Sequence, residues 1–156
     1  MRKIKAAVLG MGFIGVSHVE AIRRIGSAQM VAVADTNYEL AKSKAEQYNI
    51  SKCYETVEQL LADDEIDVIH NCTPNFLHTE INKKIIEAGK HVFSEKPVAM
   101  THEESDELLA MLKERPQIVH GVNFCYRMNP LVLDMKEKVN SGEIGKPLVV
   151  HGSYLQ

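Results

Sequence analysis

The sequence predicts a doubly wound α/β domain with a six-stranded parallel sheet, and three observations lead to this prediction. Short apolar runs alternate with amphipathic stretches over the first 121 residues. The first run, Ile4–Leu9, is nearly all apolar without alternation, as in a parallel strand covered on both faces. The glycine-rich segment G-M-G-F-I-G follows it directly and opens a helical stretch. Strand, glycines and helix in this order are typical of sheets that bind a ligand at their strand ends.

The remaining elements follow in order along the chain. Apolar runs predict five further strands at residues 30–34, 53–54, 68–72, 91–93 and 118–121. Helical spacing predicts helices up to Gly26 and over residues 41–48, 57–61, 81–86 and 101–112. Gly89 ends the fourth of these, and Thr101 with Glu104 forms a capping box that opens the fifth. Six strands joined by five crossovers match the dinucleotide-binding Rossmann fold.

Beyond Gly121 the pattern changes, so we expect three segments. Residues 1–121 form the dinucleotide-binding domain, and residues 122–147 form a linker segment with a helix opened by Pro130. Residues 148–156 are predicted as the start of a second, truncated α+β domain, with its first strand at residues 148–155, and the sequence does not contain the remainder of that domain. An exposed apolar strand edge invites association, so we expect this strand to be disordered or to pair across a chain contact.

The composition excludes several classes of function. The chain is 45% hydrophobic and 25% charged, as in an ordinary soluble globular protein. Its net charge is -3, whereas nucleic-acid binding calls for clustered Lys and Arg, so nucleic acid is not expected as a partner. Cys53, Cys72 and Cys125 are odd in number and far apart, which favours reduced thiols and a cytoplasmic protein. The basic, apolar N-terminus is not expected to be a signal peptide, because it lacks an A-x-A cleavage site. It is also too short for a membrane span of about 18 residues. The histidines show no ligand spacing, so no metal is expected.

The glycine motif is the strongest indication of function, because it lies between a strand and a helix as dinucleotide sites require. Gly10 would permit a tight turn, Gly12 a close approach of the pyrophosphate, and Gly15 close packing of helix on strand. The amides of Phe13 and Ile14 would then meet the phosphates at the positive end of the helix.

Asp35 is expected to bind the adenosine ribose. It ends the second predicted strand, 20 residues after Gly15, where a carboxylate can accept hydrogen bonds from hydroxyl groups. The following Thr36-Asn37-Tyr38 contains no cation to offset repulsion of a 2′-phosphate, so NAD is favoured over NADP. A helix N-cap is the alternative role for Asp35, and it is compatible with ribose binding.

Three further motifs give the chain a resemblance to a known family. They are T-P-N at 73–75 with His78 three residues later, E-K-P at 95–97, and N-x-x-x-R-x-N-P at 123–130. With the glycine motif, they make the whole chain similar to the Gfo/Idh/MocA oxidoreductases, which include glucose-fructose oxidoreductase and inositol dehydrogenase. The resemblance implies an NAD-dependent dehydrogenase that transfers a hydride between the nicotinamide and a sugar, polyol or related hydroxyl compound.

The resemblance also implies roles for individual residues. Lys96 is the catalytic residue, beside the nicotinamide and in contact with the reacting hydroxyl, and the bond to Pro97 is often cis. Glu95 helps to position the nicotinamide-ribose end, and Arg127 lies close to the nicotinamide, with a structural ion pair as its alternative role. The residues expected to line the cofactor after the fourth strand are Thr73, Pro74, Asn75 and His78. For Asn75 a helix cap and for His78 a first-turn structural position remain open.

In this family the second domain supplies substrate specificity and much of the oligomer interface. The full-length protein is therefore expected to form a homo-oligomer, whereas the 156-residue chain alone is expected to lack turnover. A non-catalytic NAD-binding or regulatory module of the same fold is the alternative, although the intact Lys96 favours the enzyme. A dihydrodipicolinate-reductase-like dehydrogenase would explain the glycines but not E-K-P.

Overall fold

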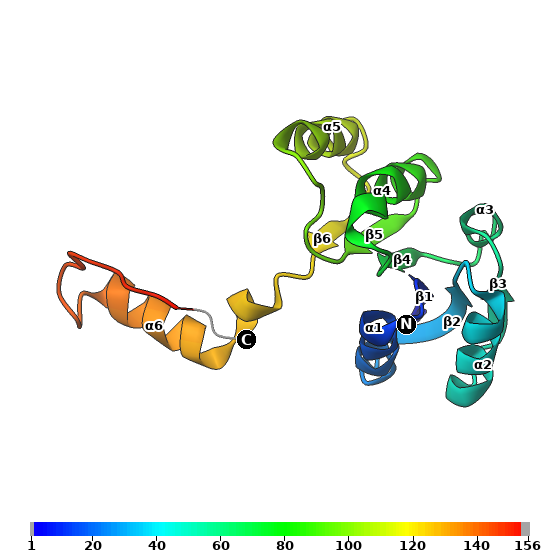
Figure 1. Cartoon of the computed structure of the whole chain (residues 1–156), viewed down its shortest axis with the longest axis horizontal. Coiled ribbons are helices and arrows are strands. Elements are labelled where there is room, and N and C mark those ends of the chain that lie inside the picture. Colours follow the sequence, from blue (N-terminus) through cyan, green and yellow to red (C-terminus); the bar gives the residue numbers. More distant parts are fainter. Residues whose placement is uncertain (1, 154–156) are drawn as a thin grey trace. The chain divides into compact units, whose positions relative to one another are not determined.

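The computed structural model describes residues 2–153 and divides the chain into two compact units (Figure 1). The first unit extends to Asn123, and the second begins at Phe124.

The first unit is built on one parallel sheet with the strand order β3-β2-β1-β4-β5-β6. The strands are β1 (Ile4–Leu9), β2 (Ala28–Ala34), β3 (Lys52–Tyr54), β4 (Val68–Asn71), β5 (His91–Ser94) and β6 (His120–Val122). All neighbouring pairs are parallel. The chain winds outward in one direction from β1 and in the other from β4. This confirms the predicted doubly wound fold and places a crevice outside the carboxyl ends of β1 and β4.

Helices cover the sheet on two faces. They are α1 (Phe13–Arg23), α2 (Tyr38–Tyr48), α3 (Val57–Leu61), α4 (His78–Glu87) and α5 (His102–Lys113), with the short 3-10 helix η1 (Asn75–Leu77) before α4. In Figure 1, α1 and α2 lie on one side of the strands and α3, α4 and α5 on the other. Alternate residues of β1 enter the two cores, since Val8 packs in the same cluster as Ile22 and Ala7 packs with Ile85. The near-continuous apolar run predicted as the first strand is therefore buried on both faces.

The helix caps follow the sequence only in part. Thr101 Oγ1 accepts a hydrogen bond from the Glu104 amide at 3.3 Å, as expected. The Glu104 carboxylate, however, accepts from the amide of Met100 at 2.8 Å, one residue before the cap. The complete capping box lies at α3 instead, where Thr56 and Gln59 each bond to the other's backbone. This second box was not predicted from the sequence.

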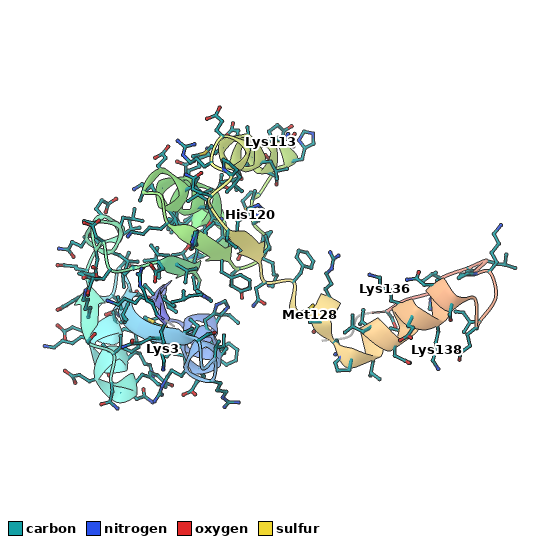
Figure 2. All side chains as sticks on the ribbon, turned by 180° about the vertical axis from the view of Figure 1, so that it is seen from behind. Lys3, Lys113, His120, Met128, Lys136 and Lys138 are labelled. Atoms are coloured by element: carbon teal, nitrogen blue, oxygen red, sulfur yellow. The ribbon has the colours of Figure 1, made fainter. Side chains whose placement is uncertain are left out.

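The second unit contains η2 (Cys125–Met128) and α6 (Pro130–Ser141). Asn129 Oδ1 accepts a hydrogen bond from the Leu131 amide at 2.9 Å and so caps α6, whose side chains include Lys136 and Lys138 (Figure 2). The helix ends at Gly142, which has a positive φ of 77°. No helix among residues 2–153 is long and apolar enough to cross a membrane.

The strand predicted at residues 148–155 does not form in the described part of that segment. Residues 148–153 have no strand conformation, and Leu148, Val149 and Val150 are 86%, 86% and 90% exposed. A strand is held by hydrogen bonds to a neighbouring strand, and the described segment has none. Tyr154 and Leu155 lie outside the described residues.

Candidate functional site

A cleft of about 840 Å³ opens at the carboxyl ends of β1, β2 and β4. Its walls are the glycine loop with the start of α1, the residues after β2, the Glu55–Glu58 segment and the loop after β4. The predicted site residues that line it are Gly10, Gly12, Phe13, Ile14, Asp35, Thr73 and Pro74. The structure therefore brings together residues from three separate loops, as expected at the point where the strand order reverses.

The glycine loop has a geometry that only glycine permits at two positions. Gly10 has a φ of +92°, and a Cβ there would lie 2.6 Å from the carbonyl oxygen of Cys72. A Cβ on Gly15 would lie 1.8 Å from the Gly10 carbonyl oxygen, so α1 packs directly against the loop. A Cβ on Gly12 would meet no other atom within 4 Å, because this residue faces open space. The loop thus leaves room beside Gly12 for a close-fitting ligand.

The first turn of α1 offers backbone N–H groups to that space. Gly12 is the N-cap residue and provides no side-chain cap, and the first turn contains no acidic residue. The N-H groups of a helix's first turn have no partner within the helix and carry partial positive charge. Phe13, the first residue of α1, is 87% exposed. This end of α1 is suited to an anion such as a phosphate.

Asp35 joins the end of β2 to the glycine loop. Its Oδ2 accepts a hydrogen bond from the Met11 amide at 2.6 Å, and its Oδ1 accepts one from the Asn37 amide at 2.8 Å. The alternative role of helix cap is wrong for Asp35, because Asn37 is the N-cap of α2 and its side chain accepts from the Leu40 amide. Each carboxylate oxygen of Asp35 keeps a second lone pair for a hydroxyl group in the cleft.

The charge of the cleft is negative. Among the described residues that line it, the charged ones are Asp35, Glu55 and Glu58, and none is Lys or Arg. Glu58 is paired with Lys84 at 2.8 Å, and this hydrogen bond lowers the pKa of the Glu58 carboxyl. A ligand that carries an additional phosphate on this side would therefore meet carboxylates without a lining cation.

The loop after β4 is held from beneath by a buried polar network. Asn71 Oδ1 accepts from Thr73 Oγ1 at 2.7 Å, while Asn71 Nδ2 donates to Asn82 Oδ1 at 2.9 Å. Asn82 Nδ2 in turn donates to Ser94 Oγ at 3.0 Å, which connects β4, α4 and β5. Burying a polar group destabilises the fold unless the group is hydrogen-bonded, so each side chain of the network needs its partners in place. The network therefore fixes Thr73 at the cleft.

His78 lies under this loop rather than in the cleft. Its side chain is fully buried, with Nδ1 2.6 Å from the carbonyl oxygen of Pro97 and Nε2 2.7 Å from that of Thr73. These contacts bridge the loops after β4 and β5. Asn75 is exposed at the start of η1, and neither η1 nor α4 has a side-chain cap, so the capping alternative for Asn75 is wrong.

The E-K-P segment leaves the end of β5 with a cis peptide bond between Lys96 and Pro97. Lys96 is exposed and Glu95 is buried. Glu95 Oε1 accepts hydrogen bonds from Asn123 Nδ2 at 2.5 Å and His18 Nε2 at 2.8 Å. Burial alone would raise the pKa of the Glu95 carboxyl, but these donors and the Lys96 amide outweigh it and lower that pKa. Glu95 is therefore a buried carboxylate with its negative charge satisfied inside the chain.

A histidine pair continues from Glu95 toward a second hollow. His18 Nδ1 lies 2.9 Å from His70 Nδ1, and burial together with the charge of His18 lowers the pKa of His70 to about 4. Both histidines line an apolar hollow of about 790 Å³ beside α1, together with Phe93 and Val119. That hollow contains none of the predicted cofactor residues. Among residues 2–153, no group of three or more His, Cys, Asp or Glu side chains is arranged to hold a metal ion.

Arg127 belongs to the second unit, in η2, where its amide donates to the Phe124 carbonyl at 3.0 Å. Its predicted contact with the cofactor stays a prediction. Four polar residues that the structure places around the two loops had no role predicted from the sequence, although one of them, Asn123, opens the N-x-x-x-R-x-N-P motif. They are His18, Asn71, Asn82 and Asn123. One signal in the sequence could have pointed to the buried network: Asn71 is a polar residue at the end of an apolar strand.

The comparisons with known proteins agree with this geometry. Residues 4–124 match the family model described as an oxidoreductase family with an NAD-binding Rossmann fold. Levoglucosan dehydrogenase of Pseudarthrobacter phenanthrenivorans is 34% identical over 100% of this chain and 42% of its own length. The scyllo-inositol 2-dehydrogenase (NAD(+)) of Bacillus subtilis is 33% identical over 96% of this chain and 44% of its own length.

Solved structures give the same result. The myo-inositol dehydrogenase of Lactobacillus casei, determined with NAD(H) and myo-inositol, superposes with a TM-score of 0.87 at 28% identity. The alignment covers 94% of this chain and 44% of that protein. The chain thus spans less than half the length of the relatives it matches.

Proposed function

The chain belongs to the Gfo/Idh/MocA oxidoreductase family with an NAD-binding Rossmann fold, and from this premise we propose that it is the cofactor-binding part of an NAD-dependent dehydrogenase. The whole protein would transfer a hydride between the nicotinamide and a hydroxyl compound such as a sugar or polyol. The observation that carries the proposal is the cleft in which the open start of α1 and the Asp35 carboxylate face the same space.

The residues of the cleft fit the parts of a dinucleotide. The amides near Gly12, Phe13 and Ile14 would hold the pyrophosphate at the positive end of α1. Asp35 would accept hydrogen bonds from the adenosine ribose with its remaining lone pairs. Thr73 and Pro74 would line the path of the cofactor between its two halves, mainly through their backbone.

NAD is the preferred cofactor in this proposal. The three charged residues of the cleft lining are carboxylates, and a 2′-phosphate would place its charge close to Asp35. Like charges in a partly desolvated site repel, and among the described residues of the lining there is no Lys or Arg to compensate.

Lys96 is proposed as the catalytic residue of the whole protein. Oxidation of an alcohol removes a hydride from carbon and a proton from oxygen, and the bound nicotinamide supplies the hydride acceptor. Lys96 Nζ would bind the reacting oxygen, stabilise its developing negative charge and take part in moving its proton. Glu95 and Arg127 would position the nicotinamide end. We place His78 as a residue that holds the loops after β4 and β5, in view of its two carbonyl partners.

The relatives named above act on inositols and levoglucosan, so a cyclic polyol or sugar derivative is the proposed substrate class. A homo-oligomer of the whole protein is part of the same proposal.

Titration with NADH and NADPH tests this function directly. We expect saturable binding of NADH by intrinsic nicotinamide fluorescence and weaker binding of NADPH. Asp35→Asn should weaken NADH binding by roughly 10-fold or more, because a hydrogen bond to a charged group contributes about 1.5–3 kcal/mol. The substitution should also reduce the difference between the affinities for NADH and NADPH.

Asp106→Asn is the matched control, because Asp106 is exposed on α5 and does not line the cleft. It should leave both affinities unchanged. Absence of saturable binding of either nucleotide would contradict the proposal, and equal NADPH binding in the unmodified chain would contradict the NAD preference.

A further inference from the structure

The Glu95 carboxylate accepts three hydrogen bonds from within the chain. Its Oε1 accepts from His18 Nε2 on α1 and from Asn123 Nδ2 after β6, while Oε2 accepts from the Lys96 amide at 3.2 Å. The donors come from three segments that are far apart in the sequence. The Glu95 amide itself donates to the Asn71 carbonyl at 2.9 Å, so the backbone on this side is fixed as well.

A buried carboxylate is costly unless it is hydrogen-bonded. The Glu95 side chain is 9% exposed and that of His18 is 7% exposed, so neither group is solvated well enough to be a surface ion pair. Asn123 and His18 donate to the carboxylate and keep the pKa of Glu95 below its ordinary value despite burial. The nearby Cys72 thiol is neutral, since burial and the Glu95 charge raise its pKa to about 12.

His70 sets the orientation of His18. The two Nδ1 atoms, 2.9 Å apart, share one hydrogen, and the low pKa of His70 keeps His70 neutral. When His70 Nδ1 donates that hydrogen to His18 Nδ1, the one ring hydrogen of a neutral His18 lies on Nε2 and is donated to Glu95. The imidazole is thereby held as a hydrogen-bond donor to the carboxylate.

We propose that His18 and Asn123 are positioning residues for Lys96: they hold the Glu95 carboxylate so that its Oε2 binds the Lys96 amide. This fixes the direction in which Lys96 leaves β5. Neither residue would contact the substrate. The catalytic role of Lys96 rests on the proposed function, whereas the hydrogen bonds that hold the Lys96 backbone do not depend on it.

The test follows the Lys96 amide by ¹⁵N NMR during an acid titration of the chain. In the unmodified chain this signal should titrate with a midpoint below 4.5, the ordinary value for a Glu pKa. His18→Leu removes one donor and should raise the midpoint by about one pH unit or more. His18→Gln keeps an N-H donor and should restore a midpoint close to that of the unmodified chain.

His102→Gln is the control, because His102 is an exposed histidine of α5 whose only charged neighbour within reach is Glu103 among the described residues. If His18→Leu does not fold, Asn123→Ala provides the same test from the end of β6. An unchanged midpoint in the folded donor-deleted variant would overturn the proposal.

NADH binding separates this proposal from the proposed function. His18→Leu should retain NADH affinity within about threefold, because the pyrophosphate and ribose contacts lie elsewhere, while the NADH-induced shift of the Lys96 amide should change. If the unmodified chain fails to bind NADH, the proposed function is wrong, and the acid titration still decides the role of His18 and Asn123.

Discussion

The glycine loop predicts opposite effects for two alanine substitutions that lie three residues apart. In Gly15→Ala, the new Cβ would lie 1.8 Å from the Gly10 carbonyl oxygen and 3.4 Å from Val8 Cγ1. The first contact is with backbone, so α1 and the loop must separate. Overpacking of this kind costs about 3 kcal/mol or more. For a chain of this size, that corresponds to a melting temperature lower by about 6–12 °C.

Gly12→Ala should instead affect binding and not folding. Its Cβ would meet no atom of the chain within 4 Å, so the free energy of unfolding should change by no more than about 1 kcal/mol. The methyl group would occupy the space proposed for the pyrophosphate and lower NADH affinity by roughly 10-fold or more, through loss of a charge-assisted hydrogen bond.

Differential scanning fluorimetry and NADH titration of the two variants provide the assay. Gly26→Ala is the control, since a Cβ there also meets nothing within 4 Å and Gly26 lies outside the cleft. A Gly15→Ala protein with an unchanged melting temperature would refute the packing argument. Unchanged NADH affinity in Gly12→Ala would refute the assignment of the loop.

Three further predictions concern stability. The His70 pKa of about 4 lies below the ordinary 6.5, so as pH falls below 6.5 the unfolded chain takes up a proton first. The chain should lose up to about 3 kcal/mol of stability between pH 6.5 and 4, and urea unfolding of His70→Gln should show a correspondingly smaller loss. Thr56→Ala removes the N-cap of α3 and should cost about 1 kcal/mol in urea unfolding, whereas an unchanged midpoint would argue against the capping box. Asn82→Ala removes one hydrogen bond from the buried Asn71 amide and one from the Ser94 hydroxyl, which keep only the His78 and Glu95 carbonyls as partners, and should cost about 1–3 kcal/mol in urea unfolding. NADH affinity is a second measure of whether the loop after β4 stays ordered.

The fold could be predicted from the sequence because its signals are periodic and local. Ile4–Leu9 has the predicted bounds, and the other strands differ from the predicted ranges by a few residues at their ends. The alternative role of Asp35 as a helix cap is wrong, because Asp35 and Asn37 are both acceptable cap residues and only the backbone geometry decides between them. The predicted strand is absent over the described residues 148–153 because an apolar, β-type sequence does not form a strand without a neighbouring strand to pair with.

The cleft could be predicted for the same reason. Glycine spacing and a carboxylate at a strand end specify backbone positions, and the structure brings Gly12 and Asp35 to one cleft. The buried network could not be predicted, because a single Asn or His in an apolar element does not reveal its partner. His18 and Asn123 are 105 residues apart in the sequence, and only the folding of the parallel sheet brings them into contact. The two carbonyl partners of His78 were hidden for the same reason.

Mapping the NADH site by ¹⁵N NMR of the chain tests the central claim most directly. The account predicts that NADH shifts the amide signals of Gly12, Phe13 and Ile14 together with those after β2. Signals beside the apolar hollow, such as those of Val119, should remain in place. Shifts that gather at that hollow, or no shifts at saturating NADH, would contradict the assignment of the cleft as the dinucleotide site.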